Sequence, residues 1–181
     1  MGLAGLKKLG LEAPLTKPTG LIIVETDGCF VDGIEVATGA TVGHRTLRVV
    51  DMGKIAATFA DVQDGTALRL APKAGVRSLA FSFAPQADER YTAQLEGYQV
   101  MPDAELFEME EVVLDPPLRA LLSTPGARVL CSCCGEEIIN ERELRREGTI
   151  RCQTCSGNGY YEVRRAVPRP ADMTGRPIAK T

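Results

Sequence analysis

The sequence has 181 residues, of which 44% are hydrophobic, so the chain is long enough to bury one core and to carry a smaller second module. Its 21 lysines and arginines are balanced by 24 acidic residues, which argues against nonspecific binding to nucleic acid or to anionic lipid. No apolar run is long enough to cross a bilayer, and the amino end lacks the pattern of a signal peptide. These features predict a cytoplasmic protein.

The amino-terminal residues predict a helix, a loop and a buried strand. Leucines recur at helical spacing up to a terminating glycine, at Leu3, Leu6, Leu9 and Gly10. Residues 12–19 contain two prolines and form the predicted loop. The unbroken apolar run 21–24 is typical of a central strand, buried on both faces.

Residues 25–44 predict a helix with a cysteine in its first turn. Asp27 is the predicted N-cap and Gly39 the predicted terminator, and one helical face is apolar, at Phe30, Ile34 and Ala37. The free N–H groups and the dipole of a helix start favour a thiolate, so Cys29 is a candidate reactive group or metal ligand. The neighbouring Asp27 and Asp32 favour this interpretation. The alternatives are a structural thiol and a merely solvated, capped helix start.

Three strand candidates follow, at 46–50, 55–59 and 67–70. The sequences between them, DMGK and DVQDG, are typical of tight antiparallel turns. The order helix, strand, helix, three strands predicts an α+β fold, in which helices pack against one face of a mostly antiparallel mixed sheet.

Residues 72–101 predict two further helices. Val76, Leu79 and Phe83 fit a first helix, although LAFSF also alternates as a strand would. A clearer second helix has apolar residues at helical spacing and ends before a proline, at Tyr91, Leu95, Tyr98 and Pro102. Residues 106–114 are the predicted exposed or linking strand.

A proline-rich stretch, 115–126, is the predicted domain boundary. It divides the chain into a core, 1–126, a finger, 127–163, and a carboxyl-terminal tail, 164–181. The tail carries net positive charge and three prolines, which predicts a mobile segment.

Four cysteines of the finger have the spacing of a structural zinc site. Cys131 and Cys134 form one C-x-x-C pair, Cys152 and Cys155 form another, and seventeen residues separate the pairs. Four thiolates satisfy tetrahedral zinc and leave no open coordination position. Because the piece is too small for an adequate apolar core, we expect metal binding to supply folding free energy on the order of 10 kcal/mol. Cys133 is the spare thiol in this interpretation.

The segments VETDGCFVDGIEVATGATVG and DMGKIAATF resemble the E-subunit domain of formylmethanofuran dehydrogenase, over roughly the first two thirds of the chain. The resemblance implies the same element order, in a fold similar to the catalytic domain of glyceraldehyde-3-phosphate dehydrogenase. It also implies that Cys29 helps to form a metal or reactive site. Further site candidates lie at matching motif positions: Asp27, Asp32 and Lys54 for catalysis, and Thr38 and Thr41 for cofactor binding.

The chain departs from that family at two positions of the implied site. Relatives begin the first helix with a His-x-Cys-Pro-Gly segment that this sequence does not contain, and Ala40 stands where they often have a cysteine. His44, the only histidine, is a candidate second ligand for a metal of unknown identity at Cys29, with an exposed turn residue as the alternative. We therefore predict that the core site is incomplete in this sequence.

The finger resembles the zinc finger of DksA/TraR-type transcription regulators, through CSCCGEEIINERELRREGTIRCQTC, and CQTCSGNG resembles a knuckle of DnaJ-type chaperones. Its arginines, Arg142, Arg145, Arg146 and Arg151, could indicate nucleic acid. Five glutamates lie among them from 136 to 147, so a solvated face of mixed charge is the preferred interpretation.

The leading functional hypothesis is a metal-binding protein that is related to this E-subunit domain and is accessory to molybdenum- or tungsten-dependent redox or one-carbon metabolism. Its expected partners are redox-enzyme subunits and a second copy of itself, because residues 79–113 carry more apolar surface than a small core can cover. The alternatives are a transcription or nucleic-acid adaptor acting through the finger, and a zinc-dependent interaction module with a degenerate core.

Overall fold

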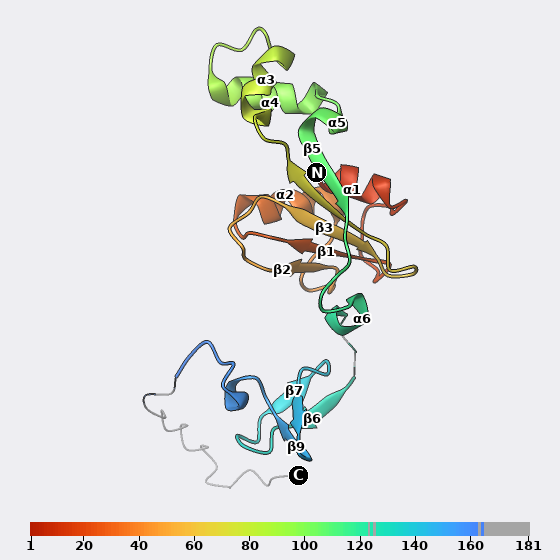
Figure 1. Cartoon of the computed structure of the whole chain (residues 1–181), viewed down its shortest axis with the longest axis vertical. Coiled ribbons are helices and arrows are strands. Elements are labelled where there is room, and N and C mark those ends of the chain that lie inside the picture. Colours follow the sequence, from red (N-terminus) through yellow and green to blue (C-terminus); the bar gives the residue numbers. More distant parts are fainter. Residues whose placement is uncertain (123, 125, 163, 165–181) are drawn as a thin grey trace, which may run out of the picture. The chain divides into compact units, whose positions relative to one another are not determined.

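The computed structural model describes residues 1–122, 124, 126–162 and 164, which fall into two compact units (Figure 1). The core unit is Met1–Leu122, and the cysteine unit contains the remaining residues. Except for Arg164, the predicted tail lies outside the described residues. Within the described part of the chain, no helix is both long and apolar enough to cross a membrane.

The core unit is built on one five-stranded sheet in the order β2-β1-β3-β4-β5. The strands are β1 (Gly20–Val24), β2 (Leu47–Val49), β3 (Ala57–Asp61), β4 (Ala67–Pro72) and β5 (Phe107–Glu111). The β1–β2 pair is parallel and the other pairs are antiparallel. The predicted α+β class with a mostly antiparallel mixed sheet is therefore confirmed. The apolar run 21–24 lies inside the sheet, between β2 and β3.

The predicted hairpin between 46–50 and 55–59 is wrong. β2 runs parallel to β1, with Ile22 opposite Leu47, and β1 separates β2 from β3. A parallel neighbour requires a crossover, and the helix α2 (Cys29–Thr38) provides it between β1 and β2. The sequence DMGK thus belongs to a loop that leads across the sheet rather than to a tight turn.

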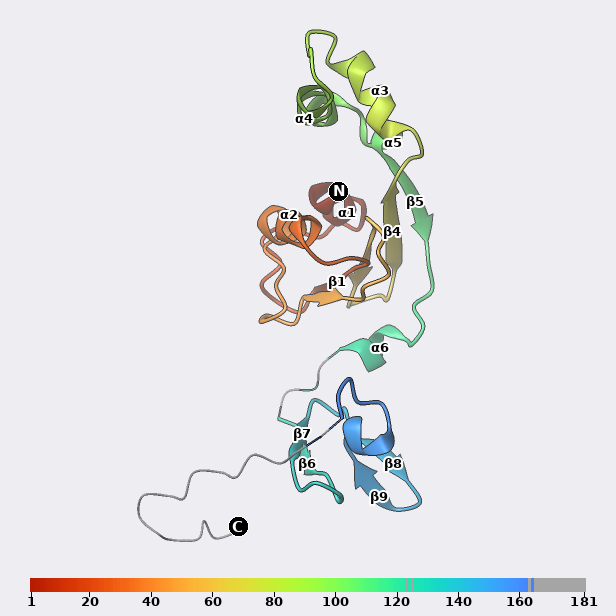
Figure 2. The ribbon, with the colours of Figure 1, turned by 90° about the vertical axis from the view of Figure 1, so that its left-hand side faces the viewer.

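Two helices, α1 (Gly2–Lys8) and α2, cover the same face of this sheet (Figure 2). Buried side chains of both helices meet the strands there, including Leu6, Ile34, Ile22, Phe59 and Leu70. A β-carbon added to Gly5 would lie 2.5 Å from the ring of Phe59, so the glycine lets α1 approach the sheet closely.

Between β4 and β5 the chain forms a pair of packed helices, α3 (Val76–Phe83) and α4 (Arg90–Val100). Both predicted helices are confirmed, but the predicted buried face of the second is wrong. Tyr91 and Leu95 are 75% and 53% exposed, and Ala93 and Gly97 are the buried residues. A β-carbon on Gly97 would lie 2.5 Å from the carbonyl oxygen of Ala80 in α3, so the helices meet backbone to backbone at small residues and the larger side chains point elsewhere.

A short helix, α5 (Asp103–Leu106), leads into β5, which pairs with β4 as the edge strand. The stretch predicted as an exposed or linking strand is therefore an edge strand with one free side. A last short helix, α6 (Leu118–Leu121), follows the two prolines at 116 and 117.

The cysteine unit consists of two short antiparallel hairpins and a helical turn. The first hairpin pairs β6 (Arg128–Leu130) with β7 (Glu137–Ile139), and the second pairs β8 (Leu144–Arg146) with β9 (Thr149–Arg151). The 3₁₀ turn η1 (Thr154–Ser156) follows. Each C-x-x-C pair lies next to a hairpin, after β6 and after β9.

Candidate metal centre and the predicted core site

The four cysteines of the two C-x-x-C pairs lie together in the cysteine unit. The Sγ atoms of Cys131, Cys134, Cys152 and Cys155 are all within 4.8 Å of one another. Tetrahedral zinc with Zn–S distances of about 2.3 Å requires sulfur atoms roughly 4 Å apart. The Sγ atoms of Cys134 and Cys152 are 4.0 Å apart, so the group has the dimensions that such a metal needs.

Backbone turns and one serine hold the two pairs against each other. Gly135, at φ 73°, completes the first turn, where its N–H donates to the carbonyl of Cys131. Ser132 then links this turn to β9, because its N–H and its hydroxyl both donate to the carbonyl oxygen of Ile150. The N–H of Ile150 in turn donates to the Ser132 hydroxyl. These bonds bring the second pair to the first.

The electrostatics of the group favour a bound cation. N–H groups from the backbone at Cys134 and Cys152 lower the pKa of the Cys131 thiol to about 6. The pKa of Cys155 is raised instead, chiefly by its hydrogen bonding with the sulfur of Cys152 and then with that of Cys133. Four clustered sulfurs cannot all ionise without compensation, and a divalent metal would supply the missing positive charge. The group could therefore hold a metal.

The predicted core residues do not come together in the same way. In residues 1–122, 124, 126–162 and 164, the four cysteines are the one group of three or more potential ligands close enough for a metal. Cys29 is the first residue of α2 and is exposed, next to a cavity of about 350 Å³ between α1 and α2. Asp27, Asp32 and His44 are also exposed.

The predicted N-cap, Asp27, is wrong, because Gly28 takes this position at φ 76° and no side chain caps the helix. Gly39 ends the helix at φ 68° in the left-handed conformation, as predicted.

The two threonines that the resemblance implied for cofactor binding hold the backbone here. The buried Thr38 hydroxyl donates to the carbonyl of Ile34 at 2.7 Å and accepts from the N–H of Ala40. The Thr41 hydroxyl accepts from the N–H of His44 at 3.0 Å. These bonds shape the end of α2 and the turn that precedes β2.

Local sequence patterns gave no sign of an ion pair next to this region, between Glu25 and Arg69. The Nε and Nη2 atoms of Arg69 donate to the two carboxylate oxygens of Glu25 at 2.6 and 2.8 Å. The Arg69 hydrogen bonds lower the pKa of the Glu25 carboxyl against the opposing effect of burial, and the charge of Lys54 contributes. The N–H of Lys54 also donates to the backbone carbonyl of Glu25, so Lys54 lies near the ion pair. An arginine within the strand ALRLAP was the available signal.

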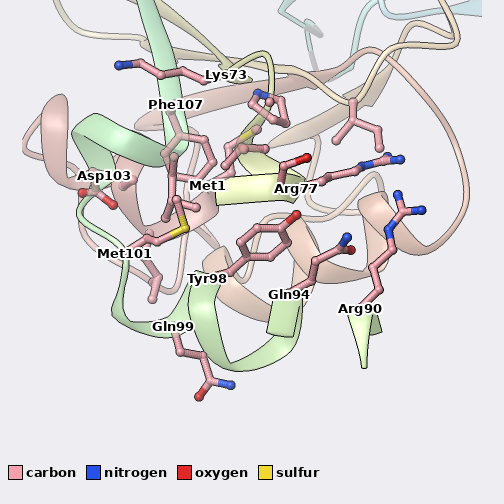
Figure 3. Close-up of a pocket in the computed structure, with 18 residues that line it drawn as sticks. Met1, Lys73, Arg77, Arg90, Gln94, Tyr98, Gln99, Met101, Asp103 and Phe107 are labelled. Carbon is pink, nitrogen blue, oxygen red and sulfur yellow. The ribbon is translucent and has the colours of Figure 1, made fainter. Parts of the chain in front are cut away.

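The core unit also contains a larger cavity, of about 910 Å³ (Figure 3). Its wall is formed by α1, the end of β4, α3, α4 and the segment leading into β5. Its ionisable side chains are Lys73, Arg77, Arg90 and Asp103. The sequence analysis did not single out these residues, because they come from separate elements without a shared motif.

Comparison with known proteins identifies the family. The family described as "FmdE, Molybdenum formylmethanofuran dehydrogenase operon" matches residues 1–108, which is more than half of the chain. The chain therefore belongs to the FmdE family, and the resemblance of the core is confirmed. The match ends before the cysteine unit, and the proposed likeness of that unit to DksA/TraR zinc fingers stays a prediction.

Two individual proteins are similar to this chain. One, from Archaeoglobus fulgidus, is named "Probable S-adenosyl-L-methionine-binding protein" and is 28% identical over 92% of this chain and 50% of its own length. The chain thus spans about half the length of that relative. The other is a crystal structure of an FmdE-like protein of tungsten formylmethanofuran dehydrogenase from Syntrophus aciditrophicus, 24% identical, with a TM-score of 0.47. That match covers 79% of this chain and 74% of the other.

Proposed function

We propose that this FmdE family protein binds one structural zinc ion through Cys131, Cys134, Cys152 and Cys155 and serves as an accessory protein in molybdenum- or tungsten-dependent redox or one-carbon metabolism. The observation that carries the metal assignment is the group of four sulfurs within 4.8 Å. All-sulfur tetrahedral ligation suits zinc, and four protein ligands leave no position for a substrate. The role of this site is therefore to hold the cysteine unit folded.

The accessory role is supported by the family description, which refers to a molybdenum formylmethanofuran dehydrogenase operon. Redox catalysis would then lie on partner subunits, with this chain contributing binding surfaces. Homodimer formation remains part of the proposal, together with a weak, incomplete metal site at Cys29. Exposed apolar side chains that could support self-association include Phe81, Leu95 and Val100.

Elemental analysis tests both parts of the proposal. Protein purified without chelator should contain one zinc per chain, and Cys29→Ala should leave this content unchanged because Cys29 is not in the four-sulfur group. Affinity purification of the tagged chain from its native cell should also retain molybdenum or tungsten above a tag-only control. Absence of zinc would refute the metal assignment, and zinc without molybdenum or tungsten would refute the accessory role alone.

Binding of S-adenosylmethionine, the function named for the archaeal relative, is a second candidate for the core unit. The 910 Å³ cavity is within the size range of small-molecule sites, which favours some ligand of this kind. S-adenosylmethionine carries two positive groups and one carboxylate, however, and the cavity wall has three cationic side chains in its described residues against Asp103. We therefore expect equilibrium dialysis to give a Kd above about 1 mM. A low-micromolar Kd would instead support the relative's function for this chain.

A further inference from the structure

The cavity of about 910 Å³ in the core unit has a charged side and an apolar side. Arg77 is in the first turn of α3, and Arg90 is the first residue of α4. In Figure 3 their guanidinium groups and the amide of Gln94 point to the same side of the cavity, while Lys73 and Gln99 extend away from it. Apolar wall residues complete the lining, among them Leu3, Val76, Met101 and Phe107.

Neither arginine of the charged side is neutralised by the protein. In the part of the chain that the structure describes, Arg77 and Arg90 have no ion-pair partner. Asp103 is the one carboxylate of the described lining, and in Figure 3 it lies at the opposite side from both guanidinium groups. Two unpaired guanidinium groups facing one cavity create a positive potential that attracts an anion.

Gln94 supplies an independent sign of a missing ligand. Its Nε2 atom is buried and has no hydrogen-bond acceptor, the only such side-chain nitrogen or oxygen among the described residues. Buried polar groups in folded proteins almost always have a partner, so an unpaired one calls for an explanation. An acceptor oxygen of a molecule in the cavity would satisfy this amide.

We propose that this cavity binds a small organic anion that has a carboxylate or phosphate group and an apolar body. Arg77 and Arg90 hold the anionic group, because a planar guanidinium matches the geometry of carboxylate and phosphate oxygens. The amide of Gln94 donates a hydrogen bond to one of those oxygens. The apolar body lies against Val76, Met101 and Phe107. The inference goes beyond the proposed zinc site and does not depend on it.

Isothermal titration calorimetry of the full chain at low ionic strength tests this site with four probes. Phenyl phosphate and phenylacetate carry the two candidate head groups on an apolar ring, inorganic phosphate lacks the ring, and benzyl alcohol lacks the charge. At least one of the two ring-bearing anions should bind, and the tighter one identifies the head group. Benzyl alcohol and inorganic phosphate should each bind at least tenfold more weakly than that anion.

Variants then locate the binding. The double change Arg77→Gln and Arg90→Gln should weaken the better probe at least tenfold, and Gln94→Leu should weaken it while raising the thermal stability of the free protein, because a buried unpaired amide is removed. Arg119→Gln, an exposed arginine of α6, is the matched control and should change neither. Circular dichroism verifies that each variant is folded. The proposal fails if neither ring-bearing anion binds, if benzyl alcohol binds as tightly, or if the double variant binds like the control.

Discussion

Replacing Cys152 with serine should unfold the cysteine unit, residues 127–162, and leave the core unit folded. Cys131 and Ile138 are the buried apolar residues among those described in this unit, so packing contributes little to its stability. Metal binding to such a module contributes on the order of 10 kcal/mol to folding. Losing one of four ligands removes most of this stabilisation. The core unit has its own sheet and buried side chains, so its stability should not depend on the metal.

Hydrogen exchange measured by mass spectrometry resolves the two units within one sample. In the Cys152→Ser variant, peptides from 127–162 should exchange at the rate of an unfolded chain, and peptides from β1 and β3 should keep their protection. Treating the unmodified protein with a strong chelator should give the same pattern. Cys133→Ser is the matched control, because the exposed Cys133 lies outside the four-sulfur group, and it should keep both zinc and protection. Protected peptides in a zinc-free Cys152→Ser protein would show that packing alone folds the unit.

The strength of local sequence signals explains which features could be predicted. Residues 21–24 form an apolar run that only a buried strand accommodates, and the two C-x-x-C spacings are set by local turns, so the central strand and the cysteine group were both expected. The neighbours of a strand depend on pairing between distant segments. The residues of DMGK fit a tight turn, yet they lie in a loop, because a parallel partner for β1 placed β2 on the far side of that strand.

Helix 90–100 shows a different limit. Its apolar period correctly indicated a helix, but size was a poor guide to burial. Because Gly97 has no side chain, α4 can approach Ala80 closely, and the buried side is the one with the smallest residues. The cavity beside this helix was equally hidden, since Arg77, Arg90 and Gln94 meet only after α3 and α4 have paired.

The second large effect concerns the ion pair of Glu25 and Arg69, which are 44 residues apart in sequence and join β4 to the end of β1. The side chain of Glu25 is 10% exposed and that of Arg69 is 26% exposed. Glu25→Gln should therefore lower the free energy of unfolding of the core unit by about 3 kcal/mol at pH 7, near the low end for a broken buried pair, because part of Arg69 remains in water. Glu110→Gln is the control, since its Oε2 is 3.8 Å from Arg69 and its side chain is 67% exposed, and it should cost less than about 0.5 kcal/mol.

The pH dependence of this effect has a definite sign. Hydrogen bonds from Arg69 hold the pKa of Glu25 below its ordinary value of 4.5, so the folded protein binds the proton less readily than the unfolded chain. The stabilising contribution is fully present above pH 4.5 and is lost as the pH falls through the folded-state pKa. Urea unfolding followed by circular dichroism should show the difference between the unmodified protein and Glu25→Gln narrowing over that interval. A difference that stays constant from pH 7 down to pH 3 would mean that Glu25 acts through its shape and not through its charge.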